Sequence, residues 1–184
     1  MSALTVPSLN DGVVQLRPPV EDDAPAIFAA CQDLEITRFN ALPSPYERHH
    51  ATGWIATVPE TWLSGTSAPM VVLDVPTGDL LGACGLLEIH DRQAEIGYWV
   101  KREARGRGVA TRAVVLVTNW GLSELGLTLI ELLCDMRNVA SQRVAEKAGY
   151  TRAGEAAPPA RCVGRSALMA RFVTHSTAPR HPAV

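Results

Sequence analysis

One stretch of the sequence joins a predicted strand to a predicted helix through two closely spaced glycines. Residues 94–100 are rich in β-branched and aromatic side chains, which favours a strand, and residues 109–125 contain no proline and suit a helix. The turn between them includes Gly106 and Gly108. Glycines at such a turn leave the backbone amides bare and let them point, with the positive end of the helix, at one spot. The stretch therefore predicts an anion site, with a phosphate as the expected ligand.

Other phosphate-binding loops fit this stretch poorly. A dinucleotide-binding loop, G-x-G-x-x-G, has its third glycine where this chain has Thr111, and the Walker pattern G-x-x-x-x-G-K-[ST] does not occur in the sequence. A solvated basic turn stays open as an alternative, because basic runs usually face water. Five basic residues lie between Lys101 and Arg112, with Glu103 as the single acid among them. This local charge suits a small polyanion better than a long one.

Composition narrows the function classes further. The chain has 184 residues, 47% of them hydrophobic, and a formal net charge of −2, so no global field favours nucleic acid or an anionic membrane. Neither a signal pattern nor a run of membrane-spanning length is present. The cysteines form no C-x-x-C pair, which argues against zinc and a disulfide framework and predicts buried thiols: Cys31, Cys84, Cys134 and Cys162. We expect a cytoplasmic protein with no nucleic-acid or membrane partner.

Periodicity and turn residues predict a single α+β domain over residues 13–173, preceded by a flexible segment, 1–12, and followed by a disordered tail, 174–184. Three predicted strands form an antiparallel meander. The predicted strands cover residues 13–17, 70–75, 80–89, 94–100, 127–134, 151–156 and 162–173, and the predicted helices begin near 22, 46, 109 and 138. Adjacent histidines, His49 and His50, are expected to face solvent rather than to bind a metal.

Two motifs carry a resemblance to a known family. Arg105, Gly108 and Ala110 match the pattern [QR]-x-x-G-x-[GA], and residues 138–150 read N-x-x-S-x-x-V-x-E-K-x-G-Y. With the opening pair Leu16-Arg17, these motifs resemble the GNAT superfamily of acyl-CoA-dependent N-acyltransferases, in its RimJ/RimL-type branch of ribosomal-protein N-acetyltransferases and their relatives. The resemblance covers about residues 13–173. It implies a twisted mixed sheet, flanked by helices, in which two strands splay apart to hold acyl-CoA.

The resemblance implies acetyl-CoA as co-substrate, without a metal, and assigns binding roles by position. The amides of residues 107–110 would hold the pyrophosphate, with the Thr111 hydroxyl beside them, and backbone groups of Trp99 and Val100 would meet the pantetheine arm, opposite the side chain of Asn138. Arg102, Arg105, Arg143 and Lys147 remain open as partners of the ribose phosphate. The full set of expected binding residues is Trp99, Val100, Arg102, Arg105, Gly106, Arg107, Gly108, Val109, Ala110, Thr111, Asn138, Ser141, Arg143 and Lys147.

The chemistry implied is direct transfer of an acyl group from a thioester to an amine. The amine must lose a proton before it attacks, so a carboxylate is wanted nearby. Glu95 is the first candidate base and Glu88 the second, although a strand glutamate often simply faces outward. Many family members carry a tyrosine where this chain has Ala145; Ser141 is the substitute expected to assist the thiolate, unless it only caps its own helix.

The leading hypothesis is an N-acetyltransferase acting on a primary amine, either a protein N-terminus or a small molecule. The alternative is a noncatalytic acyl-CoA-binding sensor on the same fold, and a nucleic-acid-binding loop is a weaker third idea. The acceptor pocket is expected to lie between the first two helices and the loops after Leu42 and Pro158, a region that carries Phe39, Tyr46, Trp54 and Trp62. Both a monomer and a homodimer remain open.

Overall fold

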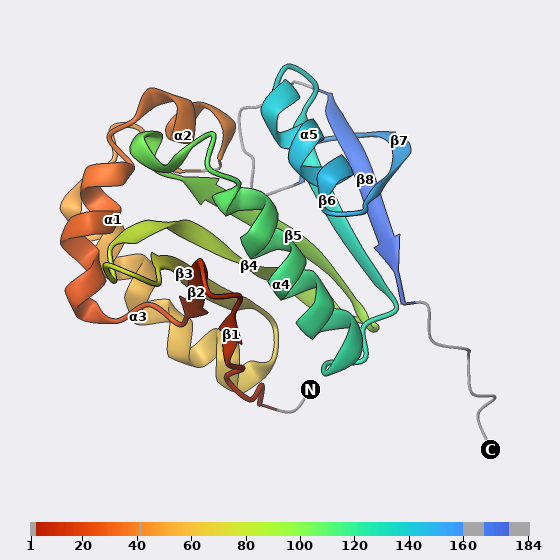
Figure 1. Ribbon diagram of the computed structural model, residues 1–184, viewed down its shortest axis with the longest axis horizontal. Helices are drawn as coiled ribbons and strands as arrows, with labels where there is room; N and C mark the ends of the chain where they lie inside the picture. The colour runs from red at the N-terminus through yellow and green to blue at the C-terminus, as the bar shows by residue number, and fades with distance from the viewer. Residues whose placement is uncertain (1–2, 41, 160–167, 177–184) are drawn as a thin grey trace.

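The computed structural model describes residues 3–40, 42–159 and 168–176. The described residues form one eight-stranded mixed sheet in the order β1-β2-β3-β4-β5-β6-β8-β7, flanked by helices (Figure 1). The strands are β1 (Leu9–Asn10), β2 (Val14–Arg17), β3 (Ala68–Asp74), β4 (Leu80–His90), β5 (Gln93–Val100), β6 (Leu129–Asp135), β7 (Thr151–Ala156) and β8 (Met169–His175). The helices are α1 (Ala24–Ala30), α2 (Leu34–Phe39), α3 (Arg48–Ser64), α4 (Val109–Ser123) and α5 (Val139–Lys147), with short 3-10 turns at Glu21–Asp23 and Arg102–Ala104.

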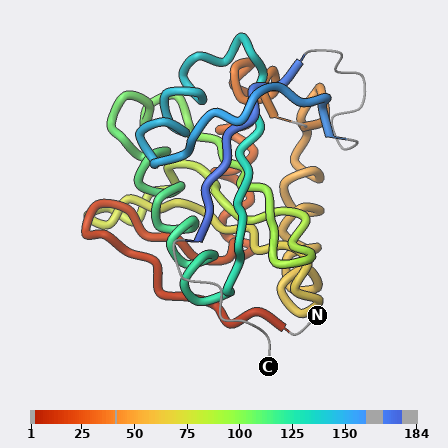
Figure 2. The backbone as a smooth tube through the Cα atoms, turned by 90° about the vertical axis from the view of Figure 1, so that its right-hand side faces the viewer, coloured from red at the N-terminus to blue at the C-terminus, as the bar shows by residue number. Residues whose placement is uncertain are grey.

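Helices cover both faces of the sheet, with α4 on one side and α1 and α3 on the other (Figure 2). Alternation along β3 explains the two cores. Val71 packs with Ile27 and Ile55 of α1 and α3, whereas Met70 and Val72 join the cluster that contains α4. The predicted α+β fold and the three-stranded meander β3-β4-β5 are therefore confirmed.

Strands β5 and β6 separate after a short parallel contact. They pair at Gln93↔Leu129, Ala94↔Ile130 and Glu95↔Glu131, and no further pair joins them. Beyond that point β5 stays paired with β4 up to Val100, while β6 stays paired with β8 up to Asp135. Strand β5 thus stays with β4 and β6 stays with β8, and the twist of the sheet separates the two halves. This is the splay that the family resemblance implied.

Several boundaries differ from the predictions. Helix α2 was not expected, and α3 continues to Ser64 although Pro59 lies inside it, because the last turns bury Val58 and Trp62. Leu9 is 7% exposed and pairs with Leu16, so the segment expected to be flexible contributes a strand.

The last strand and the tail differ in their bounds from the prediction. Strand β8 pairs with β7 as predicted but begins at Met169 and runs through Thr174 and His175, which were assigned to the tail. The rest of the predicted tail, 177–184, and the predicted strand residues 162–167 lie outside the described residues. In the described part of the chain, no helix has both the length and the apolar character needed to span a membrane.

Candidate active site

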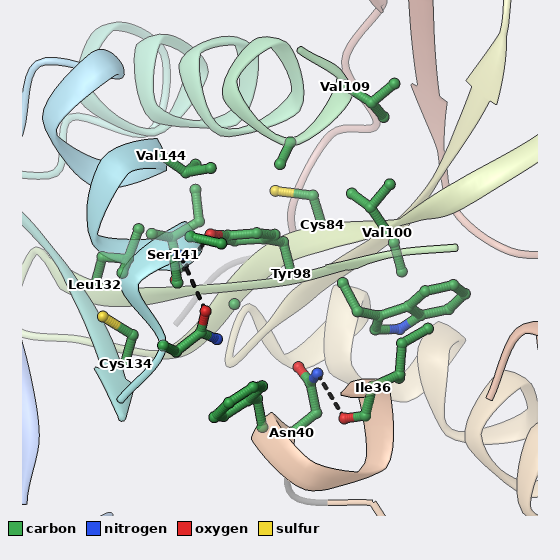
Figure 3. A pocket seen from close by; sticks show the side chains of 18 of the residues that line it. Ile36, Asn40, Cys84, Tyr98, Val100, Val109, Leu132, Cys134, Ser141 and Val144 are labelled. Carbon is green, nitrogen blue, oxygen red and sulfur yellow. Dashed lines mark hydrogen bonds between the residues drawn. The ribbon is translucent and has the colours of Figure 1, made fainter. Parts of the chain in front are cut away.

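A cavity of about 630 Å³ occupies the gap between the diverging strands. Its walls come mainly from β4, β5, β6, α2, α5 and the first turn of α4. Figure 3 shows Ile36 of α2 and Asn40, which follows that helix, on the side opposite Val109, with Tyr98 and Ser141 between them. The sequence-predicted site residues that line this cavity are Glu95, Trp99, Val100, Arg105, Gly106, Gly108, Val109, Ala110, Thr111, Asn138, Ser141, Arg143 and Lys147.

The turn before α4 has the backbone expected of an anion site. Gly106 and Gly108 have φ angles of +74° and +78°, and Gly108 is the N-cap of α4. These are left-handed values that favour glycine. A Cβ placed on either glycine would meet nothing within 4 Å, so the space over the turn is open. Because the helix's backbone bonds start with Arg112 N donating to Gly108 O (3.0 Å), the amides of its first turn have no acceptor within the helix. The turn therefore fits a pyrophosphate.

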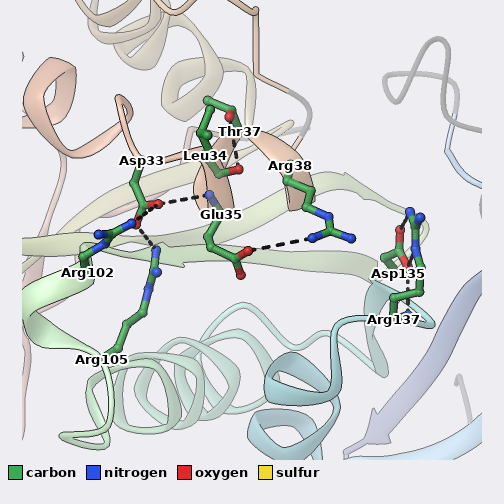
Figure 4. A network of polar contacts seen from close by, with 9 residues as sticks. All are labelled: Asp33, Leu34, Glu35, Thr37, Arg38, Arg102, Arg105, Asp135 and Arg137. Atoms are coloured by element: carbon green, nitrogen blue, oxygen red, sulfur yellow. Dashed lines mark hydrogen bonds and ion pairs between the residues drawn. The ribbon is translucent and has the colours of Figure 1, made fainter.

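The side chains of two residues in the predicted binding set point elsewhere. Arg107 pairs with Asp74 of β3 (3.3 Å), and Arg102 pairs with Asp33 (3.5 Å); neither is among the described residues that line the cavity. Arg105 also pairs with Asp33 (2.7 Å), and its Nε donates to Val100 O (3.2 Å), but it does line the cavity (Figure 4). Arg105, Arg143 and Lys147 are thus the cations that the fold brings to the site.

Asp33 connects α2 to the glycine turn. Its carboxylate accepts a hydrogen bond from Glu35 N (3.0 Å) at the start of α2 and faces Arg102 and Arg105 from the other side (Figure 4). Burial alone would raise the pKa of Asp33, but the Glu35 amide and the two guanidinium groups outweigh it and hold that pKa below its ordinary value. A charged Asp33 therefore fixes α2 beside the loop that holds the predicted phosphate.

The free edge of β5 presents alternate backbone groups to the gap. Lys101 N donates to Leu81 O of β4 (2.8 Å), and Trp99 sits two residues earlier in the same register, opposite Ala83. Alternation then turns the backbone groups of Tyr98 and Val100 toward the gap and those of Trp99 toward β4. Of the two residues expected to offer backbone groups, Val100 therefore faces the gap and Trp99 does not, while the backbone of Tyr98 also faces the gap.

Two carboxylates line the cavity among the described residues, and one of them was the predicted base. Glu95 stands at the last paired position of β5 and β6, at the apex of the gap. Glu35 of α2 is the second, and the sequence analysis missed it because α2 itself was not expected. Glu88, the other predicted candidate, lies where the β4–β5 register shifts and is not among the lining residues.

Helix α5 places a serine at the cavity wall. The Asn138 side chain accepts from Ser141 N (3.1 Å), so Asn138, and not Ser141, caps the helix. The Ser141 hydroxyl lies 2.8 Å from Tyr98 Oη, across the gap on β5. Tyr98 is a site residue that the sequence analysis missed, although its place two residues before Val100 on one strand is a signal for it. Ala145, where many family members carry tyrosine, is fully buried in the core.

The cysteines agree with their predicted role where they are described. Cys31, Cys84 and Cys134 are buried, and burial raises the pKa of Cys31 to about 11. They are therefore thiols rather than thiolates near neutral pH. Cys162 lies outside the described residues.

Comparison with known proteins identifies the fold's family. Residues 14–151 match the acetyltransferase (GNAT) domain. The chain belongs to the GNAT acetyltransferase family. This GNAT protein is 30% identical over 150 residues to the uncharacterized N-acetyltransferase YoaA of Bacillus subtilis, covering 80% of this chain and 85% of that one.

Solved structures extend the likeness of this GNAT protein. The ribosomal-protein-S5-alanine acetyltransferase of Vibrio fischeri superposes with a TM-score of 0.80 at 18% identity, covering 93% of this chain and 97% of that one. The spermidine N-acetyltransferase of Vibrio cholerae, solved with CoA and spermine, gives 0.75 at 20% identity, covering 91% and 98%. The RimJ/RimL-type resemblance and the assignment as an acyl-CoA-dependent acetyltransferase are confirmed.

Proposed function

We propose that this protein transfers an acetyl group from acetyl-CoA directly to a primary amine. The observation that carries the proposal is the single cavity that joins the glycine turn before α4 to a carboxylate at the apex of the splayed strands. A phosphate site and a base are the two parts that this transfer needs, and here they open into one space.

The chain's own groups divide the work along the cavity. The amides at the start of α4 hold the pyrophosphate, and the hydroxyl of Thr111 stands beside them. Arg105, Arg143 and Lys147 are the cations in reach of further phosphate. The backbone of Tyr98 and Val100 holds the pantetheine arm as a strand holds its neighbour. A backbone N–H on this edge also meets the oxyanion that develops on the acyl carbon.

Glu95 is the proposed general base. An amine with a pKa near 10 is mostly protonated at neutral pH and must lose a proton to become a nucleophile. Glu95 lines the cavity at the point where β5 and β6 separate, and this position supports its role toward an amine bound there. Ser141 is the proposed donor to the departing sulfur. With both roles assigned to cavity residues, no observation favours a noncatalytic sensor.

The acceptor side of the cavity is mainly apolar and carries two acidic side chains. Its walls include Ile36, Phe39 and Trp54, and the lining carboxylates in the described part of the chain are Glu35 and Glu95. A polyamine carries several separated cations and needs more acidic partners than these. The lining favours an acceptor with one amine on an apolar body, such as an arylalkylamine or a peptide N-terminus with an apolar residue.

Thermal unfolding with acetyl-CoA tests the donor half of the proposal. A ligand at a hundred times its Kd stabilises the native state by about 2.7 kcal/mol. For a chain of this size each kcal/mol shifts the Tm by about 2–4 °C, so we expect a saturable rise of roughly 5–10 °C. No rise with either acetyl-CoA or CoA would refute the proposed donor.

Thiol release from acetyl-CoA tests the acceptor half. Phenethylamine, a peptide with an N-terminal alanine and spermidine are compared at equal concentration. We expect turnover with the first two to exceed that with spermidine. A clear preference for spermidine would overturn the single-cation acceptor while leaving the acetyltransferase assignment in place.

A further inference from the structure

The hydrogen bond between Tyr98 and Ser141 spans the gap in the sheet. Tyr98 belongs to β5 and Ser141 to α5, 43 residues apart, and their oxygens lie 2.8 Å apart on the wall of the cavity (Figure 3). The Ser141 side chain also lies against the Cys134 thiol of β6, and Ser141 is 9% exposed. The hydrogen bond thus joins a buried serine to a partly buried tyrosine at the cavity wall.

The chemistry of the two hydroxyls decides which one donates. A phenol is more acidic than an aliphatic alcohol, so it is the better donor and the poorer acceptor. Burial raises the pKa of Tyr98, and its hydroxyl keeps its proton at neutral pH. In the described residues no other hydrogen-bond acceptor is recorded for Tyr98 Oη than Ser141 Oγ. Tyr98 therefore donates, and the single proton of Ser141 is left to point away from Tyr98.

We propose that Tyr98 is a positioning residue that turns the Ser141 hydroxyl proton toward the thioester sulfur in the cavity. This inference rests on the proposed function. In the transfer the C–N bond forms and the C–S bond breaks, with the electron pair of the C–S bond leaving on sulfur. Ser141 gives its proton to that sulfur and recovers one from the proton shed by the attacking nitrogen. Tyr98 keeps its own proton and holds Ser141 in the donating orientation.

The chain contains a matched control for this role. Tyr150 is a buried tyrosine whose hydroxyl likewise bonds a hydroxyl side chain, that of Thr118, at 2.7 Å. Neither residue is among those that line the cavity. Tyr150→Phe therefore removes the same kind of hydrogen bond away from the site. Its kcat shows the effect of losing a buried hydrogen bond that has only a structural role.

Kinetics of the variants give the first test. We expect Tyr98→Phe to lower kcat about tenfold with the KM for acetyl-CoA unchanged, because one oriented hydrogen bond is lost. Ser141→Ala should lower kcat about a hundredfold. The double variant should be no slower than Ser141→Ala alone, since Tyr98 acts through Ser141. Tyr150→Phe should leave kcat as it is. Multiplying effects in the double variant, or equal kcat losses in the two Phe variants, would overturn the proposal.

A binding test works without an acceptor. Calorimetry compares CoA with desulfo-CoA, which lacks only the sulfur. We expect CoA to bind the native protein about fivefold more tightly, and this ratio to fall toward one in Ser141→Ala and Tyr98→Phe but not in Tyr150→Phe. Equal binding of the two ligands to every variant would sink the role of Tyr98 and leave the proposed function standing. If neither ligand binds, the proposed function fails and takes the inference with it.

Discussion

At the scale of single residues, two glutamates seven positions apart in the meander differ in whether they line the cavity. Glu95 lines the cavity at the apex of the gap, whereas Glu88 has a φ of +49° at a shift in the β4–β5 register and lies outside the lining. Both are strand glutamates, and alternation alone does not separate them. The divergence of β6 from β5 does, because it opens a space beside one and not the other.

Glu95→Gln tests the base. We expect kcat to fall about a hundredfold at neutral pH, since the amide has no basic lone pair for the amine proton. The deficit should shrink as the pH approaches the pKa of the amine, because less acceptor then needs deprotonation. Steady-state thiol release across pH measures both effects. Glu88→Gln serves as the comparison; an equal loss there would remove Glu95 from its role.

At the scale of elements, the glycine turn and α4 act as one unit. Gly108 caps α4 in a left-handed conformation, and the space above it, where the proposed phosphate would lie, is open. Gly78, in the turn between β3 and β4, has nearly the same conformation, with a φ of +74° against +78°, and equally open surroundings. A side chain would strain the backbone at either position, but only the space over Gly108 belongs to the proposed phosphate site.

Substituting leucine at each of these glycines separates strain from binding. We expect Gly108→Leu and Gly78→Leu to lower the Tm by similar amounts, because both force a side chain into the left-handed region. Only Gly108→Leu should raise the Kd for acetyl-CoA, by about tenfold or more, equivalent to about 1.4 kcal/mol. Calorimetric titration of each variant measures the Kd for acetyl-CoA. Unaltered affinity in Gly108→Leu would place the pyrophosphate elsewhere.

The elements also show what a sequence alone can predict. The turn at Gly106 and Gly108 was predictable because glycine chemistry is local, and so was the meander with its short turns. Helix α2 was missed because its six residues are held by long-range contacts such as Asp33 with Arg105. The pair Tyr98 and Ser141 was missed for the same reason: it exists only because α5 lies across the gap from β5.

At the scale of the whole molecule, carboxylates paired with arginines tie segments of the chain together. Asp11 pairs with Arg112 and Asp33 with Arg105 across the fold, and Asp23 pairs with the nearby Arg17, each at 2.7 Å. In all three, burial works to raise the pKa of the carboxyl but hydrogen bonds and the guanidinium charge prevail and lower it. The native state therefore binds these protons less readily than the unfolded chain does.

Acid unfolding follows from the sign of these shifts. A folded-state pKa below the unfolded value of 3.8 means that the stabilisation is fully present above about pH 4 to 5 and is lost as the pH falls through the folded pKa values. We expect the Tm to be nearly flat from pH 7 to pH 5 and to drop steeply below pH 4. Asp23→Asn, which removes the carboxylate paired with Arg17, should lower the Tm at pH 7 and flatten the drop. A Tm that rises on acidification would contradict this.

The splay of β5 from β6 has a consequence for handling the protein. From residue 96 to Val100, β5 offers main-chain groups that β6 does not take up, so the free protein carries an open strand edge in the middle of its own sheet. Open edges are where chains stick to one another. The pantetheine arm, itself built around amide groups, would close that edge as a substitute strand. If coenzyme A occupies the gap as proposed, preparations that retain it should resist aggregation better than those stripped of it.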